Sequence, residues 1–396
     1  MTSETPDSNV GETPSIGRRS RSWAARALAF TALVAYTLVF SEIFVRLFDP
    51  QAVMPRYITG TAWGVRGNIP NARYRHHTPE VDVQYRINSQ GLRADRDYSL
   101  IKPAGVCRIA VFGDSFLFGL EADLKDTFSD RLEKSLRARG IPAEVLNFAV
   151  GGFGTAEMLQ TYEQYGRKFD PDIVMFSWDL SDLNDNVRSD LYRLEDGRLI
   201  RAHATYLPAV GIQDLLMKYR LYRFIADHSQ LYTFVRERLN VLLKRRQLDA
   251  QKSRLGAEPP PDAEEGAAPA ERDLDELQHR NKIDLSAAIL RHARDEIVES
   301  GKEFYLIDIP SRVSRTEFSS PLDVLPDSIR HEIPVVVAEP AMRRAARPDL
   351  LLYYEKGLGH LTPTGIGILV GEAVQVLEAS PHLESCASSS RPLPHG

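Results

Sequence analysis

The sequence predicts an α/β domain around a mainly parallel sheet, preceded by one N-terminal transmembrane helix. From residue 104 onward, short apolar runs alternate with helical periods, and near the N-terminus an apolar run follows a group of arginines. Strands that alternate with helices form right-handed βαβ units, which build parallel sheets. The net charge of -5 over 396 residues gives no electrostatic reason to expect a nucleic-acid partner.

The segment 23–48 is predicted to anchor the chain in a membrane. Its uninterrupted apolar core, 27–41, is shorter than the roughly 20 residues of a spanning helix, but Arg26 and Arg46 can reach opposite interfaces of a tilted helix. Residues 1–22 are expected to be a disordered cytoplasmic terminus. Because arginines precede the span and few basic residues follow it, the rest of the chain is expected outside the cytoplasm, in the periplasm, with the anchor in the inner (cytoplasmic) membrane. A cleaved signal peptide is the alternative, although no small-x-small cleavage pattern follows the apolar run.

Composition divides the remainder of the chain. Residues 49–103 alternate β-like runs with turn residues and are predicted to be an approach segment rather than a separate domain. The main domain, 104–379, contains a predicted helical insertion at 191–254, which packs on the core or lies near a membrane surface, and a flexible linker at 255–272. The tail, 380–396, is polar and expected to be disordered.

Strands and helices of the main domain follow from its apolar periods. The predicted strands are 107–112, 145–150, 173–178, 304–309 and 334–337, and the predicted helices are 127–139, 155–167, 283–300 and 364–379. The 2 cysteines, Cys107 and Cys386, stand far apart in the sequence. They predict neither a disulfide framework nor a metal site, and no metal or organic cofactor is implied.

The most informative motif is Gly113-Asp114-Ser115, at the end of the first predicted strand. A turn between a strand and a helix can hold a hydroxyl above the carboxyl edge of a parallel sheet, where α/β proteins place their chemistry. Ser115 is therefore the candidate nucleophile, and Asp114 is expected to hold the turn by hydrogen bonding. Among the 10 histidines, His360 lies in a glycine-rich loop before the last helix and is the candidate base, with a solvated loop histidine as the alternative.

The order of these parts resembles the SGNH hydrolases, also called the GDSL esterase and lipase superfamily, in its membrane-anchored bacterial branch. The matching blocks are Gly113 to Ser115, Asn147 to Gly154, an Asp- and Asn-rich turn after the third strand, and His360. The resemblance covers about Tyr85 to Ala379, interrupted by the insertion and the linker. It implies a flavodoxin-like three-layer α/β/α fold, the SGNH fold, with serine chemistry on esters.

The resemblance also implies a role for each matching residue. Ser115 is the nucleophile and its own N–H is one oxyanion donor, the Gly152 N–H is a second donor, and His360 takes and returns the proton. The glycines around residue 152 are equally explained by a tight turn that needs a positive φ.

Two positions depart from the family pattern. In the family, the third block supplies an asparagine whose side-chain amide donates to the oxyanion. In this sequence the block is Trp178 to Asn186, and the residue at the position of that asparagine is either Ser181 or Asn184, depending on the alignment. The acid that orients the histidine lies two or three residues before it in the family. Here the nearest acid upstream of His360 is Glu355, which is the possible orienting acid.

These features together predict a membrane-anchored, extracytoplasmic serine ester hydrolase that acts through an acyl-serine intermediate. By resemblance, the expected substrate is an acylated cell-envelope glycan or exopolysaccharide, with acetyl as the acyl group. One alternative is a catalytically weakened member that binds a glycan or an envelope or polysaccharide assembly partner. Another is a polysaccharide O-acetyltransferase that uses the same residues. Besides its substrate, the membrane is the expected partner, through the N-terminal helix.

Overall fold

The computed structural model describes residues 17–49, 57–205 and 268–389, together with 215, 216, 219–236, 238, 239 and 242. The chain divides into two units, Met1–Gln51 and Ala52–Gly396. Residues 1–16 and 390–396, which are predicted to be disordered, lie outside the described residues. So does most of the predicted linker.

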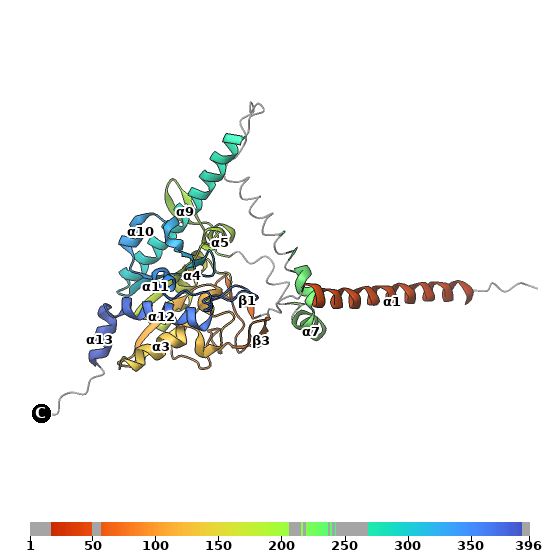
Figure 1. Cartoon of the computed structure of the whole chain (residues 1–396), viewed down its shortest axis with the longest axis horizontal. Helices are drawn as coiled ribbons and strands as arrows, with labels where there is room; N and C mark the ends of the chain where they lie inside the picture. Colours follow the sequence, from red (N-terminus) through yellow and green to blue (C-terminus); the bar gives the residue numbers. More distant parts are fainter. Residues whose placement is uncertain are drawn as a thin grey trace, which may run out of the picture. The chain divides into compact units, whose positions relative to one another are not determined.

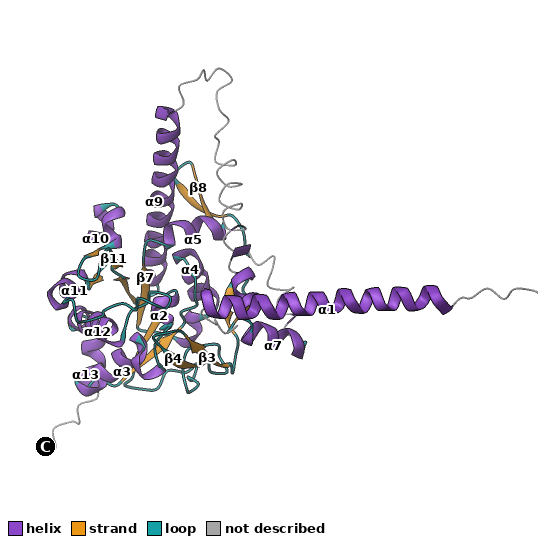
Figure 2. Cartoon of the chain, turned by 45° about the vertical axis from the view of Figure 1, so that its right-hand side comes forward, coloured by secondary structure: helices purple, strands orange, loops and turns teal. Residues whose placement is uncertain are grey.

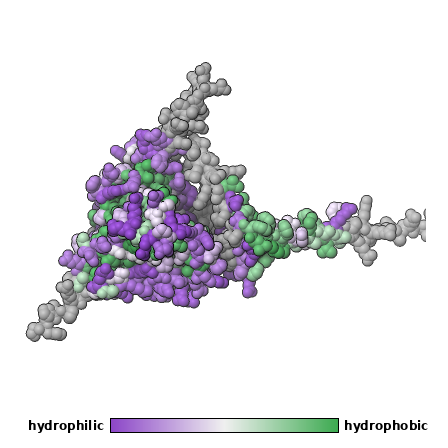
Figure 3. Space-filling model, viewed as in Figure 1, coloured by the Kyte–Doolittle hydropathy of each residue, from purple (hydrophilic) through white to green (hydrophobic). Residues whose placement is uncertain are grey.

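The first unit consists of one long apolar helix, α1 (Gly17–Phe48). It begins before the predicted start at Trp23, so residues 17–22 are helical. Its apolar side chains, except that of Val45, are largely exposed, as the green atoms in Figure 3 show. Within the described residues, Trp23–Phe48 is the one segment long and apolar enough to cross a membrane, with a mean hydropathy of 2.0. The same properties fit a membrane span and a signal sequence.

The second unit is built on a five-stranded sheet with the order β13-β10-β7-β5-β6, in which every neighbouring pair is parallel. The strands are β5 (Cys107–Phe112), β6 (Ala143–Asn147), β7 (Ile173–Trp178), β10 (Glu303–Asp308) and β13 (Val335–Val337). This is the strand order of flavodoxin-like doubly wound folds, whose ligands bind where the order reverses, beside the first strand. The predicted α/β fold with a parallel sheet is confirmed.

Helices cover both faces of this sheet (Figures 1 and 2). The side chains of β5 alternate between two cores. Ile109 and Val111 pack with the helices α3 (Phe128–Ala138) and α12 (Pro363–Leu377), whereas Ala110 and Phe112 pack with the helices on the other face. The helices of that second face are α4 (Thr155–Gln164), α5 (Asp182–Ser189) and α9 (Ala268–Glu299).

The approach segment forms two antiparallel hairpins. Strands β1 (Ile58–Gly60) and β2 (Arg66–Asn68) make the first, and β3 (Arg73–His77) and β4 (Asp82–Arg86) make the second. Two buried tyrosines, Tyr57 and Tyr85, pack their rings against Phe118. The segment thus shares the core of the main domain and contacts the helix that follows the nucleophile turn.

The predicted helical insertion begins differently from the prediction. Residues 192–201 form a hairpin of β8 (Tyr192–Glu195) and β9 (Arg198–Arg201), so the prediction that the insertion is helical from residue 191 is wrong. The reason is the Asp196-Gly197 turn, where both residues have a positive φ, as a two-residue hairpin requires. A helix, α7 (Arg220–His228), follows. The helix α9 begins well before residue 283 and includes the end of the predicted linker, because this stretch is rich in Ala, Glu and Leu.

Two predictions about the cysteines and the tail are wrong. Cys107 and Cys386 form a disulfide across a separation of 279 residues, and residues 381–389 form the helix α13 (Pro381–Ser389). Cys107 begins β5, and α12 brings the chain back to this amino edge of the sheet. Distance in the sequence therefore gave no indication of distance in space. Leu383 is buried in the same core, which holds α13 in place.

Several short elements complete the domain. They are α2 (Ser115–Phe118), η1 (Leu124–Asp126), η2 (Gly166–Phe169), β11 (Ser311–Arg312), β12 (Phe318–Ser319), η3 (Pro321–Val324), α10 (Asp327–Glu332) and α11 (Glu339–Ala345).

Candidate active site

The nucleophile turn lies at the carboxyl end of β5. Asp114 is the N-cap of the one-turn helix α2, and its Oδ1 accepts the N–H of Phe116 at 2.9 Å. Gly119 ends the helix in the left-handed region. This arrangement fixes Ser115 as the first residue of α2, at the edge where the strand order reverses. Asp114 holds the turn by hydrogen bonding, as the sequence predicts.

His360 meets Ser115 although the two residues are far apart in the sequence. Its Nε2 lies 2.8 Å from Ser115 Oγ. The imidazole is mostly buried, and its ring centroid lies 5.0 Å from that of Phe116. The His360 carbonyl accepts the N–H of Tyr354 at 2.9 Å, which fixes the loop before α12. The structure therefore brings the predicted nucleophile and the predicted base into hydrogen-bond contact.

The acid beside the histidine is Glu121, which sequence reasoning missed. Its Oε2 lies 3.3 Å from His360 Nδ1 and accepts the His360 N–H at 3.1 Å, while Oε1 accepts the Leu358 N–H at 2.8 Å. Because a carboxylate only accepts, Nδ1 carries the imidazole proton and Nε2 is left to accept from the serine. Burial opposes the charge of Glu121, but the bonds from His360 and Leu358 outweigh it and hold the pKa of this carboxyl below its usual value.

The geometry of Glu121 explains why its role is invisible in the sequence. The residue follows α2 with a positive φ of 68°, which turns its side chain back toward the histidine loop. Gly357 leaves room for it, because a Cβ there would lie 1.8 Å from Glu121 Oε1. The sequence offered one signal for this acid: a glutamate lies six residues after Ser115. It is far from His360 in the sequence, so nothing there linked it to the histidine.

Glu355 does not orient His360, so that prediction is wrong. Its Oε1 accepts from Arg315 Nε at 2.9 Å, and this pair is exposed. The Glu355 N–H donates to Glu80 at 2.7 Å, and only the later N–H groups of this loop, those of Leu358 and His360, donate to Glu121. Sequence proximity to the histidine suggested Glu355, but the packing of α2 supplies a different acid.

Gly152 occupies the turn between β6 and α4. The Val150 N–H donates to the Gly113 carbonyl at 3.0 Å, so this turn lies against the nucleophile turn. Gly152 has a positive φ of 77°, as a tight turn requires. The backbone N–H groups of Ser115 and Gly152 make no hydrogen bond within the described part of the chain. Both the tight turn and a free donor are therefore present at Gly152.

Arg66 of β2 holds this turn and was not predicted. Its Nη1 donates to the Gly151 carbonyl at 3.3 Å, and its Nη2 donates to the Gly152 carbonyl and to the buried Glu157. In a trans peptide the C=O and the N–H point in opposite directions. By binding the Gly151 carbonyl, Arg66 therefore fixes the direction of the Gly152 N–H. The approach segment thus contributes directly to the site.

The third block provides no side-chain contact to the nucleophile. Ser181 precedes α5, is exposed, and its hydroxyl lies 3.4 Å from an oxygen of Asp185. Asn184 is also exposed, and its Oδ1 accepts from Lys282 of α9 at 2.9 Å. Neither residue makes a hydrogen bond to Ser115 or Gly152 within the described part of the chain. The structure thus selects neither Ser181 nor Asn184 as the third oxyanion donor.

Buried carboxyls surround the nucleophile turn on this side. Burial, followed by the nearby Asp179 charge, raises the pKa of Asp114 and that of Asp182 well above the usual value. Asp114 Oδ2 lies 3.5 Å from Ser115 Oγ. Burial therefore makes both of these carboxyls harder to ionise than an exposed aspartate.

Two groups of side chains among the described residues have the spacing of metal ligands. The first contains the sulfurs of Cys107 and Cys386, which are already joined as a disulfide. In the second, Glu163 accepts from Arg201 and Tyr192, so a cation already compensates its charge. Neither group adjoins Ser115, and neither fits a metal that takes part in serine chemistry.

No family model and no curated protein matches this chain. Solved structures do align with it. LAE5, an α/β hydrolase enzyme from the metagenome of Lake Arreo in Spain, aligns with a TM-score of 0.37 and 10% identity over 69% of this chain and 95% of that one. Axe2, an acetylxylan esterase from Geobacillus stearothermophilus, aligns with a TM-score of 0.35 and 13% identity over 68% and 93%.

A GDSL-like lipase from Bacteroides thetaiotaomicron aligns with a TM-score of 0.32 and 11% identity over 68% of this chain and 87% of that one. Such neighbours are GDSL lipolytic proteins and acetylxylan esterases. The resemblance of this chain to the SGNH hydrolases rests on its own strand order, nucleophile turn and histidine loop.

Proposed function

We propose that this chain is a serine ester hydrolase of the SGNH type. The observation that carries the proposal is the line of contacts from Ser115 Oγ through His360 to Glu121. In this line the imidazole can accept the serine proton at Nε2 while Glu121 stabilises the positive charge that forms on the ring. A serine without such a base is a poor nucleophile.

The reaction proceeds in two halves. Ser115 Oγ attacks the ester carbonyl, its proton moves to His360 Nε2, and the tetrahedral intermediate collapses when the same proton passes to the leaving alcohol. A water molecule then gives its proton to His360 and attacks the acyl-serine carbonyl. The bond from the acyl carbon to Ser115 Oγ breaks as His360 returns this proton to Oγ, which releases the acid and restores both residues. The N–H groups of Ser115 and Gly152 are the proposed donors to the oxyanion.

The cellular site of this activity is also part of the proposal. We propose that α1 anchors the chain in the inner (cytoplasmic) membrane and that the hydrolase domain lies in the periplasm. Two features support this: the length and apolar character of α1, and the Cys107–Cys386 disulfide, since disulfides persist mainly in oxidising compartments. An acylated cell-envelope glycan is the proposed substrate class.

The test is hydrolysis of p-nitrophenyl acetate by the full chain in detergent. The wild type is expected to hydrolyse the ester and Ser115→Ala to lose the activity by at least about 10³-fold, because the nucleophile is gone. Ser135→Ala, at a half-buried position of α3, is the matched control and should retain wild-type rates. Equal rates in Ser115→Ala and the wild type would overturn the proposal.

One observation favours a second candidate function. The third block contributes no amide to the nucleophile, so a weakened relative that binds a glycan or an assembly partner is the competing proposal. Loss of one oxyanion donor costs about 10²–10³ in rate. A folded wild-type protein that neither hydrolyses the acetate ester nor reacts with a fluorophosphonate would support this second function.

A further inference from the structure

The helical part of the insertion exposes many apolar side chains. Among the described residues from 215 to 242, nine large apolar side chains are exposed. The described ranges 57–205 and 268–389, together more than ten times as long, have seven. Single exposed apolar side chains are ordinary, whereas a group of them in one segment marks an interaction surface.

Helix α7 presents three of these side chains on one face. Leu221, Phe224 and Ile225 are 71%, 62% and 39% exposed, and their spacing of three and four residues makes them neighbours on a helix. A different side of the helix is packed. Ala226 there is 1% exposed, and the Tyr222 hydroxyl lies 3.0 Å from that of Tyr232, in the helical residues 230–236. The exposed apolar face is therefore separate from the packed side of α7.

Positive charge accompanies this face. Arg220 and Arg223 are exposed on α7 itself. In the sequence, residues 215–246 include eight Lys and Arg against two Asp and Glu, a net charge of +6 in a chain whose net charge is -5. A helix with Leu, Phe and Ile on one face and arginines beside them fits a bilayer surface, where acyl chains take the apolar groups and anionic headgroups take the arginines.

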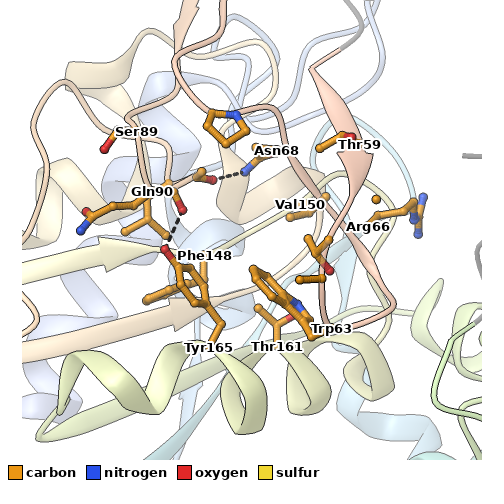
Figure 4. Close-up of a pocket in the computed structure, with 17 residues that line it drawn as sticks. Thr59, Trp63, Arg66, Asn68, Ser89, Gln90, Phe148, Val150, Thr161 and Tyr165 are labelled. Atoms are coloured by element: carbon orange, nitrogen blue, oxygen red, sulfur yellow. Dashed lines mark hydrogen bonds between the residues drawn. The ribbon is translucent and has the colours of Figure 1, made fainter. Parts of the chain in front are cut away.

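Aromatic side chains in the approach segment and α4 behave differently. In the cavity of about 300 Å³ beside the hairpin β1–β2, the half-buried ring of Trp63 stacks on that of Tyr165, with centroids 4.6 Å apart (Figure 4). The Tyr165 hydroxyl donates to the Gln90 carbonyl at 3.0 Å. These rings pack against protein even at the wall of a cavity, so the exposure of Leu221 and Phe224 is a property of α7.

The link to α1 limits the distance between the domain and a membrane. In the proposed function α1 spans the membrane and ends at Phe48, and β1 begins at Ile58. Ten residues of extended chain reach at most about 35 Å, so the start of β1 stays within this distance of the bilayer. A tethered surface binds as an intramolecular partner, so a short amphipathic helix stays bound even where its own affinity is low.

We propose that the exposed face of α7 lies in the surface layer of the membrane that α1 spans, as a second contact of this chain with anionic lipids. The inference rests on the proposed anchor and not on the esterase chemistry. Leu221, Phe224 and Ile225 enter between the headgroups, and Arg220 and Arg223 bind the lipid phosphates. Two contacts in place of one limit the rotation of the hydrolase domain about its tether.

The test places a fluorophore on this face in the full chain. Both native cysteines form the Cys107–Cys386 disulfide, so Leu221→Cys supplies one thiol for an NBD label. The chain is reconstituted one per nanodisc, in phosphatidylglycerol and phosphatidylcholine in equal amounts or in phosphatidylcholine alone, and quenching by doxyl-labelled lipids is measured. We expect strong quenching in the anionic discs and little at Thr316→Cys, in an exposed turn.

A double variant tests the role of the arginines. Each arginine near an anionic surface contributes about fivefold, so Arg220→Gln with Arg223→Gln should lower the ratio of bound to free face about 25-fold in the anionic discs. Arg75→Gln with Arg280→Gln is the matched control, because both arginines are exposed and pair with surface acids, and it should leave the ratio unchanged.

The outcomes separate this inference from the proposed function. A chain that stays with the discs but shows no more quenching at residue 221 than at residue 316 overturns the α7 contact and leaves the anchor intact. A blue-shifted label that no doxyl lipid quenches assigns the face to protein and also overturns the contact. Equal quenching in both lipid mixtures overturns the recognition of anionic lipids. Release of the chain from the discs overturns the anchor and this inference together, while hydrolysis of p-nitrophenyl acetate tests the esterase independently.

Discussion

The candidate site has two halves, the side chains around Ser115 and the third block after β7, and they differ in how many contacts they make with the nucleophile. In the first half, Ser115, His360 and Glu121 form a continuous relay, with 2.8 Å from the serine oxygen to the imidazole and 3.3 Å from the imidazole to the carboxylate. In the second half, the third block after β7 presents Ser181 and Asn184, whose polar atoms contact Asp185 and Lys282 instead. The line of contacts proposed as the proton relay is complete, whereas the proposed oxyanion donors are backbone N–H groups alone.

The halves also differ in charge. The bonds to Glu121 lower its pKa, so an ionised acid faces the ring that becomes positive in the proposed reaction. Beside the nucleophile turn, burial and the charge of Asp179 raise the pKa of Asp114 and of Asp182. The two halves thus differ in how readily their carboxyls ionise. The comparison teaches that the acid beside the histidine can come from a distant position in the chain, while the third block brings no side chain to the nucleophile.

The largest expected effect among the supporting residues comes from Glu121. In Glu121→Gln the charge that stabilises the imidazolium is lost, and kcat for p-nitrophenyl acetate should fall by about 10²–10⁴. Glu355→Gln is the matched control, because that acid pairs with Arg315 on the surface, and it should stay within about twofold of the wild type. A larger loss in Glu355→Gln than in Glu121→Gln would return the orienting role to Glu355.

A smaller but clear loss of hydrolytic activity is expected in Arg66→Met. The variant keeps the length of the side chain and loses the bond to the Gly151 carbonyl that orients the Gly152 N–H, while Arg188 still binds the Gly152 carbonyl at 3.0 Å. We expect kcat for p-nitrophenyl acetate to fall by about 10- to 100-fold, with KM little changed. Arg75→Met, which removes an exposed arginine that pairs with Asp82, is the control. A change confined to KM would contradict the positioning role.

Substitutions in the third block, the turn after β7, are expected to change the rate of hydrolysis only slightly. Ser181→Ala and Asn184→Ala remove side chains that contact neither Ser115 nor Gly152, so each should change kcat by less than about threefold. This expectation is far below the roughly 10²–10³ of a lost oxyanion donor. Steady-state kinetics of both variants with p-nitrophenyl acetate measure this change in kcat. A loss of 100-fold in either variant would mean that this residue reaches the oxyanion in the reacting complex.

The smallest effect concerns stability and pH. Burial raises the pKa of Asp308, at the end of β10 beside Trp178, to about 7. Between about pH 4 and 7 the unfolded carboxyl is ionised while the folded one keeps its proton, so its contribution to stability falls as pH rises, by up to about 1.4 kcal/mol per pH unit.

Asp308→Asn should therefore remove this slope while its amide oxygen still accepts from Ser320. Denaturant unfolding at pH 5 and pH 7 measures this slope, with Asp349→Asn, an exposed acid that does not act on Asp308, as the control. An unchanged slope in Asp308→Asn would show that this carboxyl ionises normally in the folded chain.

The sequence carried enough information for the sheet, the nucleophile and the base. Apolar strands alternating with amphipathic helices define the parallel sheet, and the Gly-Asp-Ser turn and the glycine-rich loop identified Ser115 and His360. These signals are local, because each depends on a strand end or a helix start. Glu121, Arg66 and the Cys107–Cys386 disulfide depend on contacts between distant segments, and no local pattern marks them.

The central claim, an activated Ser115, is tested most directly by a fluorophosphonate probe, which reacts with serines that an adjacent base activates. The full chain in detergent is labelled and digested, and the modified peptide is identified by mass spectrometry. The account predicts labelling at Ser115 in the wild type, and labelling at least about 100-fold slower in His360→Ala, because the base is absent. No labelling of the folded wild type, or equal rates in His360→Ala, would contradict it.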